Sequence, residues 1–192
     1  MRALGIDLPG LSHKSIEKRP HPPGQHGLKT RRVSDFGKKL IEKQKLRFNY
    51  GLGERQLRLL FAEAKRGKAN TGEKLLELLE RRLDNFVFRA GFAPTLVAAR
   101  QLVRHGHVLL NGRRANIPSL RTRPGDEIAL REKALVIPSV AESLGAPALT
   151  RPEWLAFDEA ARKARITRTP TGDEVPFPVE VQQVIEYYTP RM

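Results

Sequence analysis

The residues best suited to chemistry in this sequence form a group of eight arginines with one histidine among them. A planar guanidinium can bind a phosphate through two parallel hydrogen bonds, or stack on an unpaired base. We interpret the group as a surface for structured RNA, although a single arginine of this kind is often only part of a solvated helix face. The members are Arg81, Arg82, Arg89, Arg100, Arg104, His105, Arg113, Arg114 and Arg123.

Two predicted helices and a small sheet position this group. The apolar spacing predicts one helix over residues 71–91 and a shorter one over residues 95–106. Asn111 and Gly112 are the residue pair that a type I′ hairpin turn requires. Antiparallel strands are therefore predicted at residues 107–110, 113–117 and 127–130.

The rest of the chain predicts a second, helical domain built from both ends of the sequence. An irregular, Pro-rich arm extends through Arg32, and two amphipathic helices follow at residues 34–51 and 54–67. We expect a connection at residues 134–152, an amphipathic helix at 153–163, a strand and turn at 166–178, and a last short element at 179–188. The apolar side chains of that last element need another surface, and the amino-terminal helices provide the closest one.

These assignments predict an α+β, mostly helical fold with a discontinuous helical domain and an inserted module of two helices plus a small antiparallel sheet. The predicted domains are an arm and helical domain at residues 1–80, the module at 81–141, and a segment at 142–192 that packs back on the helical domain.

Charge favours a nucleic-acid partner. The 192 residues carry 35 Lys and Arg against 21 Asp and Glu, a net charge of +14. The net charge is +8 for residues 1–50, +4 for 51–100, +4 for 101–141 and −2 for 142–192. Such an excess promotes binding to polyanions by releasing their counterions. We therefore expect the first 141 residues to build the basic surface, without the tail.

Composition also excludes several classes of protein. No apolar run is long enough to span a bilayer or to act as a secretion signal, so we expect an intracellular protein without membrane contact. The absence of cysteine excludes disulfides, thiol catalysis and thiolate metal sites. His13, His21 and His26 are too scattered in the arm to predict a metal site, and no cofactor or catalytic group is expected.

Several motifs in the module resemble the RNA-binding module of the S4 family of small-ribosomal-subunit proteins. They are Leu79-Glu80-Arg81-Arg82-Leu83, Arg89, Thr95, Ala99-Arg100, Leu102-Val103, Gly106-His107-Val108 and Asn111-Gly112-Arg113. The resemblance continues outside the module, in Pro23-Gly24-Gln25-His26-Gly27, Ser34-Asp35-Phe36-Gly37, Glu42-Lys43-Gln44-Lys45, Tyr50-Gly51, Gly53-Glu54-Arg55-Gln56, Asn70-Thr71-Gly72-Glu73 and Val184-Ile185-Glu186-Tyr187-Tyr188. Because these motifs cover nearly the whole chain, the resemblance is to the ribosomal protein family, cysteine-free and of bacterial or organelle type.

The resemblance implies a structural protein that binds 16S-type rRNA early in assembly of the small subunit. It further implies a place in the cytoplasm or an organelle, contact with the neighbouring small-subunit proteins S5 and S3, and a role in translational accuracy. In the arm, Lys29, Arg31 and Arg32 are expected beside the mRNA entry path. The expected rRNA-binding residues are Gln25, His26, Lys38, Lys39, Lys43, Lys45, Arg47, Arg55, Arg81, Arg82, Arg89, Arg100, Arg104, His105, Arg113, Arg114 and Arg123.

The sequence departs from the family pattern at two places. Many members carry Arg directly after the capping residue of the second module helix, where this chain has Leu96. Members also commonly begin with a basic, aromatic stretch ahead of the position of Met1, so a start upstream of Met1 stays open. Two other functions use the same module: an RNA-modifying enzyme, which needs a further catalytic domain, and a regulator of mRNA, a role that some family members add by repressing their own message.

Overall fold

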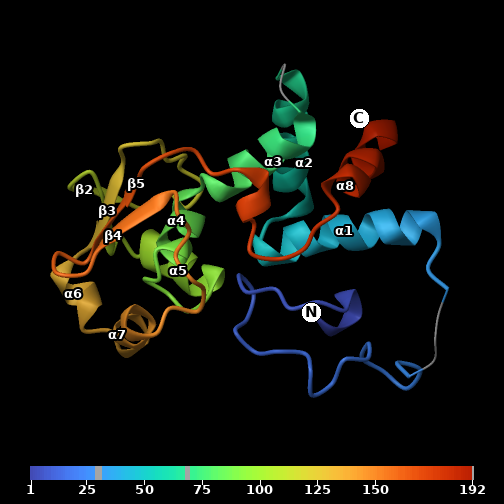
Figure 1. Cartoon of the computed structure of the whole chain (residues 1–192), viewed down its shortest axis with the longest axis horizontal. Coiled ribbons are helices and arrows are strands. Elements are labelled where there is room, and N and C mark those ends of the chain that lie inside the picture. The colour runs from blue at the N-terminus through green and yellow to red at the C-terminus, as the bar shows by residue number, and fades with distance from the viewer. Residues whose placement is uncertain (29–31, 68–69, 192) are drawn as a thin grey trace. The chain divides into compact units, whose positions relative to one another are not determined.

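The protein is seen in a computed structural model that describes residues 1–28, 32–67 and 70–191 (Figure 1). The chain divides into two compact units, Met1–Leu75 with Phe177–Met192, and Leu76–Pro176. Within the described residues the fold contains eight α-helices and one five-stranded sheet. The predicted α+β, mostly helical fold with a discontinuous helical domain is confirmed.

Two helices from the amino-terminal half form the frame of the first unit. In α1 (Asp35–Asn49), the Ser34 side chain caps the first turn by accepting a hydrogen bond from the amide of Gly37 at 3.2 Å. The helix ends at Gly51, whose φ of 55° permits the left-handed turn that closes it. The next helix is α2 (Glu54–Arg66), which buries Leu57, Phe61 and Ala64 along one face.

The carboxy-terminal helix α8 (Val181–Tyr188) completes this unit by packing along α1. Tyr188 stacks on Phe61 with ring centroids 5.0 Å apart. Phe177, which precedes the helix, packs against Tyr50 at 6.2 Å. A short 3₁₀ helix, Thr189–Arg191, follows α8. The two ends of the sequence therefore share one hydrophobic core, as predicted.

The arm is more ordered than an extended loop. After a 3₁₀ turn at Arg2–Leu4, Leu8 is completely buried and the amide of Gly10 donates to Oδ1 of Asn49 at 2.9 Å. The arm also folds back on itself, because Nε of Arg2 donates to the carbonyl oxygens of Arg19 and His21 at 3.1 and 3.0 Å. These contacts fix the start of the arm against the end of α1.

Helix α3 (Thr71–Glu80) leads into the second unit, which contains α4 (Leu83–Arg89), α5 (Leu96–Arg104), α6 (Glu132–Leu135), α7 (Pro138–Gly145) and the short 3₁₀ helix η2 (Gly172–Glu174). The connection expected at residues 134–152 thus contains one short helix and the end of another, and Pro138 sits at the first position of α7, where its missing amide costs no hydrogen bond. The strands of the sheet are β1 (Val108–Leu110), β2 (Arg113–Ala115), β3 (Glu127–Leu130), β4 (Leu155–Asp158) and β5 (Lys163–Ile166).

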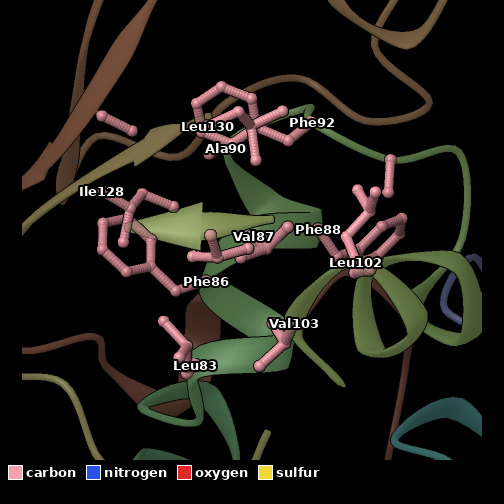
Figure 2. Packing of buried hydrophobic residues seen from close by; sticks show 14 of the residues in the cluster. Leu83, Phe86, Val87, Phe88, Ala90, Phe92, Leu102, Val103, Ile128 and Leu130 are labelled. Carbon is pink, nitrogen blue, oxygen red and sulfur yellow. The ribbon is translucent and has the colours of Figure 1, made fainter. Parts of the chain in front are cut away.

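The sheet is antiparallel throughout, in the order β2-β1-β3-β5-β4. The predicted hairpin is confirmed, with Asn111 and Gly112 at φ values of 50° and 76° between β1 and β2. One face of the sheet is buried against the helices. Figure 2 shows this core, in which side chains from α4 and α5 pack against Ile128 and Leu130.

One predicted helix is interrupted. Residues 71–91 form α3 and α4, separated at Arg81 and Arg82, because a later loop takes the backbone hydrogen bonds there. The amide of Leu83 donates to the carbonyl of Leu120 at 2.8 Å, and the amide of Thr122 donates to the carbonyl of Arg81 at 2.8 Å. These long-range bonds compete with helical bonds at the junction, which a local apolar pattern cannot reveal.

The prediction for residues 142–176 is wrong. The expected helix at 153–163 is instead the β4 strand, a turn and the start of β5, and the segment lies in the second unit. The spacing of Trp154, Leu155 and Phe157 fits a helix, but Trp154 is buried just before the strand, and β5 pairs with the otherwise open edge of β3. Only residues 177–192 pack back on the helical unit.

Candidate nucleic-acid interface

Helix α5 presents the most open part of the predicted surface. The Thr95 hydroxyl caps it by accepting from the amide of Ala98 at 3.2 Å, and Leu96 is buried in the core. The residue at this departure from the family pattern therefore serves packing. At the other end, Arg104 and His105 are exposed. The hydrogen-bond donors of these two side chains are therefore accessible to a ligand in solution.

The hairpin and the turn before β3 hold further exposed arginines on a rigid base. Oδ1 and Oδ2 of Asp126 accept from Nδ2 of Asn111 at 2.8 Å and from the amide of Arg123 at 2.7 Å, so the two turns are joined. Arg113 and Arg123 are exposed beside them. Like Arg104, they have no side-chain ion pair or hydrogen bond among the described residues. Such side chains can neutralise phosphates without first losing a protein partner.

The side chain of Arg114 packs against the end of α5. Its guanidinium lies over Gly106, where a Cβ atom would collide with it, and Gly106 has a φ of 69°. Glycine is favoured at this position by the left-handed backbone that ends the helix, and the Arg114 side chain could keep its present place only above a residue without a Cβ atom. Arg114 itself remains exposed.

Two of the predicted arginines converge on a buried carboxylate. Asp84 is fully buried and accepts from Nε and Nη2 of Arg82 at 3.0 and 2.9 Å. Nε of Arg100 donates to Oδ2 of the same carboxylate at 2.9 Å. Arg82 is 8% exposed and its guanidinium neutralises Asp84, so the structure gives no support to its prediction as an RNA contact. Arg100 is partly accessible, although Asp84 holds its position.

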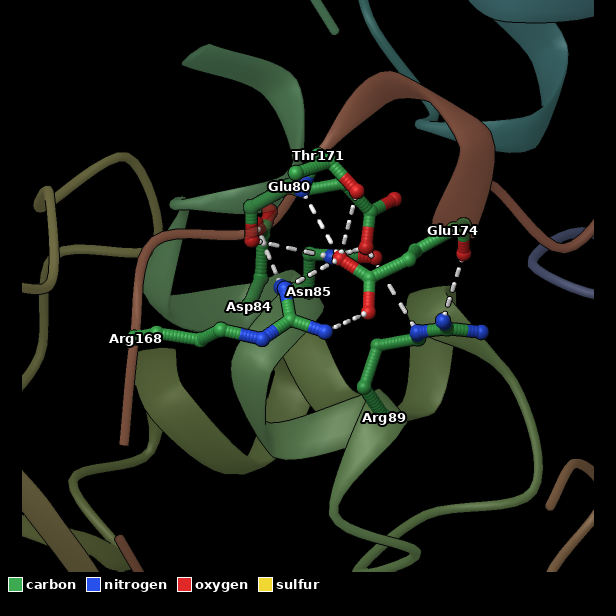
Figure 3. Close-up of polar contacts among 7 residues, drawn as sticks. All are labelled: Glu80, Asp84, Asn85, Arg89, Arg168, Thr171 and Glu174. Carbon is green, nitrogen blue, oxygen red and sulfur yellow. Dashed lines mark hydrogen bonds and ion pairs between the residues drawn. The ribbon is translucent and has the colours of Figure 1, made fainter. Parts of the chain in front are cut away.

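Arg89 is also buried, in the polar cluster that Figure 3 shows. Its Nε lies 3.5 Å from Oε2 of Glu80, and its Nη2 donates to the carbonyl oxygen of Glu174 at 2.7 Å. The Glu174 carboxylate in turn accepts from Arg168 at 2.7 and 2.9 Å and from the Thr171 amide at 2.8 Å. Burial of Glu174 alone would raise its pKa, but the hydrogen bonds from Arg168 and Thr171 lower it overall. Arg89 therefore links α4 to Glu174 in η2, near the end of the second unit, and its buried side chain is not accessible to RNA.

Arg81 is partly buried. Its Nη1 donates to Glu77 at 2.7 Å and its Nε donates to the carbonyl of Thr122 at 2.9 Å. Its main structural effect is to hold the loop before β3 against the end of α3.

The predicted bases of α1 are mostly paired. Lys43 is 3% exposed and donates to Oε2 of Glu54 at 2.7 Å, so the structure gives no support to its prediction as an RNA contact. Lys45 donates to Oε1 of Glu42 at 2.6 Å, and Lys39 lies 2.9 Å from Glu186, whose pKa it lowers. Arg47 donates to the carbonyl of Leu52 and to Gln44, both at 3.3 Å. Lys38, with a weak contact to Asp35 at 3.3 Å, and Arg55 are exposed.

In the arm, Gln25, His26 and Arg32 are exposed. Lys29 and Arg31 lie outside the described residues. No group of three or more His, Asp or Glu side chains in the described part of the chain is placed to hold a metal ion. No helix among these residues is long and apolar enough to cross a membrane.

The structure also exposes bases that the sequence analysis did not select. Lys163 and Arg165 lie on β5 and Arg131 follows β3, all in the second unit. The alternation Lys163-Ala164-Arg165-Ile166 is the signal that could have found two of them, since a period of two indicates a half-buried strand. The predicted exclusion of residues 142–192 from the basic surface is therefore wrong for β5.

Comparisons with known proteins cover the whole chain. A family model described as the ribosomal protein S4/S9 N-terminal domain matches residues 1–80, and one described as the S4 domain matches residues 81–128. The protein named small ribosomal subunit protein uS4 of Methylobacillus flagellatus is 63% identical over 100% of this chain and 95% of the relative. The protein named uS4B of Nitrosomonas europaea is 62% identical over the same shares.

A more distant relative gives the same result. The uS4 protein of Thermus thermophilus is 49% identical over 91% of this chain and 85% of the relative. The chain belongs to the uS4 family of small-ribosomal-subunit proteins, which are RNA-binding structural proteins of translation and not enzymes.

Proposed function

We propose that this chain binds 16S-type rRNA directly and holds RNA helices in a fixed relative orientation. The observation that supports this most strongly is the set of exposed bases on α5, the hairpin and the turn before β3, which have no acidic partner among the described residues. They are Arg104, His105, Arg113, Arg114 and Arg123. Their mechanism is electrostatic, because each base that neutralises a phosphate releases condensed counterions.

The rigidity of these elements supports a structural role. The hairpin is joined to the next turn through Asn111 and Asp126, and the end of α5 is fixed by Gly106. Bases on rigid elements keep a constant spacing, so they favour one arrangement of phosphates over others. A protein of this kind would act early, by stabilising the junction of RNA helices around which the subunit body assembles.

The finer roles of the family are part of the same proposal. Lys29, Arg31 and Arg32 would line the mRNA entry path, and Gln25, His26, Lys38 and Arg55 would extend the RNA contact to the first unit. Neighbouring small-subunit proteins, S5 and S3, would bind the same protein and link it to translational accuracy. Its place is then a ribosome of the bacterial cytoplasm or of an organelle. Repression of its own mRNA would be an additional use of the same surface.

A salt titration with the purified chain tests the proposal. Six to ten phosphate contacts predict a loss of about 10³–10⁵ in affinity for a 16S-type rRNA fragment between roughly 50 and 200 mM salt. In the variant Arg104→Gln with Arg123→Gln, we expect weaker binding and a slope of log affinity against log salt that is shallower by roughly one for each lost contact. The exposed Lys133, outside the predicted set, provides the control Lys133→Gln.

Sedimentation of a cell lysate separates this function from that of a free regulator of mRNA. A ribosomal role predicts that the chain travels with the small subunit, and that crosslinking recovers small-subunit rRNA in near-stoichiometric amounts. Recovery of only a few transcripts, or no binding of folded rRNA at moderate salt, would contradict the proposal.

A further inference from the structure

The sheet of the second unit has a second face that the proposed RNA surface does not use. Successive residues of a strand point to opposite faces, and one face here is buried against the helices. The opposite set defines the outer face: Leu109, Arg114, Glu127, Ala129, Ala156, Asp158, Lys163 and Arg165. The hydrophobic core lies between the outer face and α5, so the two are on opposite sides of the unit.

The register brings bases from three separate segments to the outer face. Arg114 pairs with Leu109, Ala129 with Lys163, and Glu127 with Arg165. Arg131 follows β3, two positions after Ala129, and its amide donates to the carbonyl of His107 at 2.9 Å, which continues the same row.

The two acids of this face leave a positive excess. Lys163 lies 3.0 Å from Glu127, with both side chains more than 40% exposed, so this pair is solvated and weak. Oδ1 of Asp158 accepts from the amide of Ala161 at 2.9 Å in the adjoining turn. Arg114, Arg131 and Arg165 have no side-chain ion pair or hydrogen bond among the described residues. The guanidinium of Arg114 lies over Gly106 at the end of α5 and belongs to the hairpin surface, so those of Arg131 and Arg165 are the ones available on the outer face.

The side chains between these bases indicate what kind of RNA fits. Sheets that bind single strands stack bases on aromatic rings. The eight positions of the outer face contain no aromatic side chain, and its apolar members are Leu109, Ala129 and Ala156. Lys163 and Arg165 lie on β5, inside the sheet, between β3 and the edge strand β4. A face with exposed bases and no ring for stacking fits the phosphates that border the wide, shallow minor groove of an A-form duplex.

We infer that the outer face binds the phosphate backbone of an RNA duplex, separate from the RNA held by α5 and the hairpin. The inference rests on the proposed rRNA binding and extends it, because the second unit then contacts RNA on two opposite sides. Arg131, Lys163 and Arg165 supply the phosphate contacts. The contact is to the backbone and not to unpaired bases, since no aromatic side chain on this face is available for stacking.

The absence of cysteine from the whole sequence allows a direct test with a chelated iron probe on single introduced thiols. The full chain would carry the probe at Ala156→Cys on the outer face, at Gln101→Cys on α5, or at the control Glu142→Cys on α7, all exposed positions. Each protein is bound to 16S-type rRNA, and hydroxyl radicals from the iron cleave the nearby RNA backbone.

Strong cleavage from positions 156 and 101, at different nucleotides, and weak cleavage from position 142 are the expected result. If position 101 cleaves while position 156 cleaves no more than position 142, the outer face binds no RNA and the proposed function stands. Cleavage at the same nucleotides from both positions would also overturn a separate site. Cleavage from none of them, with a chain that fails to bind rRNA, would overturn the inference together with the proposed function.

A binding measurement tests the residues themselves. The variant Arg131→Gln with Arg165→Gln should weaken rRNA binding and lower the salt slope by roughly two, as expected for two lost phosphate contacts. The variant Lys133→Gln, an exposed base outside this face, is the matched control. An unchanged slope in the double variant, with normal thermal unfolding, would contradict the assignment.

Discussion

Arginine serves two different purposes in the second unit, and burial decides which one applies at each position. Arg82 and Arg100 both bind the fully buried carboxylate of Asp84, whereas Arg104 is exposed and has no side-chain ion pair or hydrogen bond within the described part of the chain. Charge reversal at Arg100 would place a second carboxylate against Asp84 and cost folding stability. Charge reversal at Arg104 would change the binding of a ligand and leave the folding stability nearly unchanged. Of these two predicted RNA contacts on α5, Arg104 can therefore be changed without disturbing a buried ion pair, and Arg100 cannot.

The first prediction concerns Asp84. In Asp84→Asn the shape is kept but the two guanidiniums lose their buried counter-charge, so we expect the free energy of unfolding to fall by about 3–5 kcal/mol. Urea unfolding followed by circular dichroism measures the change. The exposed variant Arg104→Gln should stay within about 0.5 kcal/mol of the unchanged protein. Equal stabilities for all three proteins would show that the Asp84 pairs contribute little.

At the scale of elements, tertiary contacts decide where helices and strands end. The junction of α3 and α4 opens because the loop at 118–122 takes the local backbone hydrogen bonds, and β5 forms because β3 offers an edge. At the end of α5, Gly106 has a left-handed backbone conformation, and the Arg114 side chain covers it. The position of the exposed Arg114 side chain thus depends on a glycine eight residues earlier.

Two glycine variants separate these effects. Gly106→Ala and Gly112→Ala both force alanine into a left-handed backbone, with φ values of 69° and 76° in the present structure, at a cost of about 1–2 kcal/mol. No atom lies within 4 Å of a Cβ at Gly112, whereas at Gly106 it would displace Arg114. Because the exposed Arg114 side chain can move aside, we expect similar losses of thermal stability for the two variants, and weaker rRNA binding for Gly106→Ala only. Equal rRNA binding by the two variants would exclude a role for the position that Arg114 occupies.

At the scale of the whole molecule, the two ends of the chain are joined by a polar link. Glu54 accepts from Lys43 at 2.7 Å and from the hydroxyl of Tyr188 at 2.8 Å, which ties α8 to α1 and α2. Partial burial of Glu54 favours a higher pKa, but hydrogen bonds from Lys43 and Tyr188 and the charge of Lys43 outweigh it and lower the pKa. Burial and the same carboxylate raise the pKa of Tyr188.

Because Glu54 takes part in this link, we expect the folding stability to depend on pH. Because the folded state lowers the pKa of Glu54, its contribution is complete above the unfolded value of 4.5 and is lost as the pH falls through the folded value. At neutral pH we expect Glu54→Gln to lower the free energy of unfolding by about 1–2 kcal/mol, a figure reduced for solvent screening because Glu54 is 45% exposed. The difference from the unchanged protein should shrink below pH 4.5.

Urea unfolding at a series of pH values provides the measurement, with the exposed Glu17→Gln as the control that should show no such trend. A difference that stays constant from neutral to acidic pH would mean that the charge of Glu54 does not stabilise the link between the chain ends.

The sequence by itself determined the basic character, the mostly helical fold, the Asn111-Gly112 hairpin and the return of the last helix to the first unit. These follow from composition, from local periodicity and from turn chemistry, which act over a few residues or over the whole chain. Only the tertiary structure decided that Lys43, Arg82 and Arg89 are buried and that β5 brings Lys163 and Arg165 to the sheet. The partner of Arg82 is Asp84, only two residues away, but a local pattern does not show that both are buried. Lys43, Arg89 and β5 depend on partners more than ten residues away, namely Glu54, Glu174 and β3, and a local pattern carries no information about such partners.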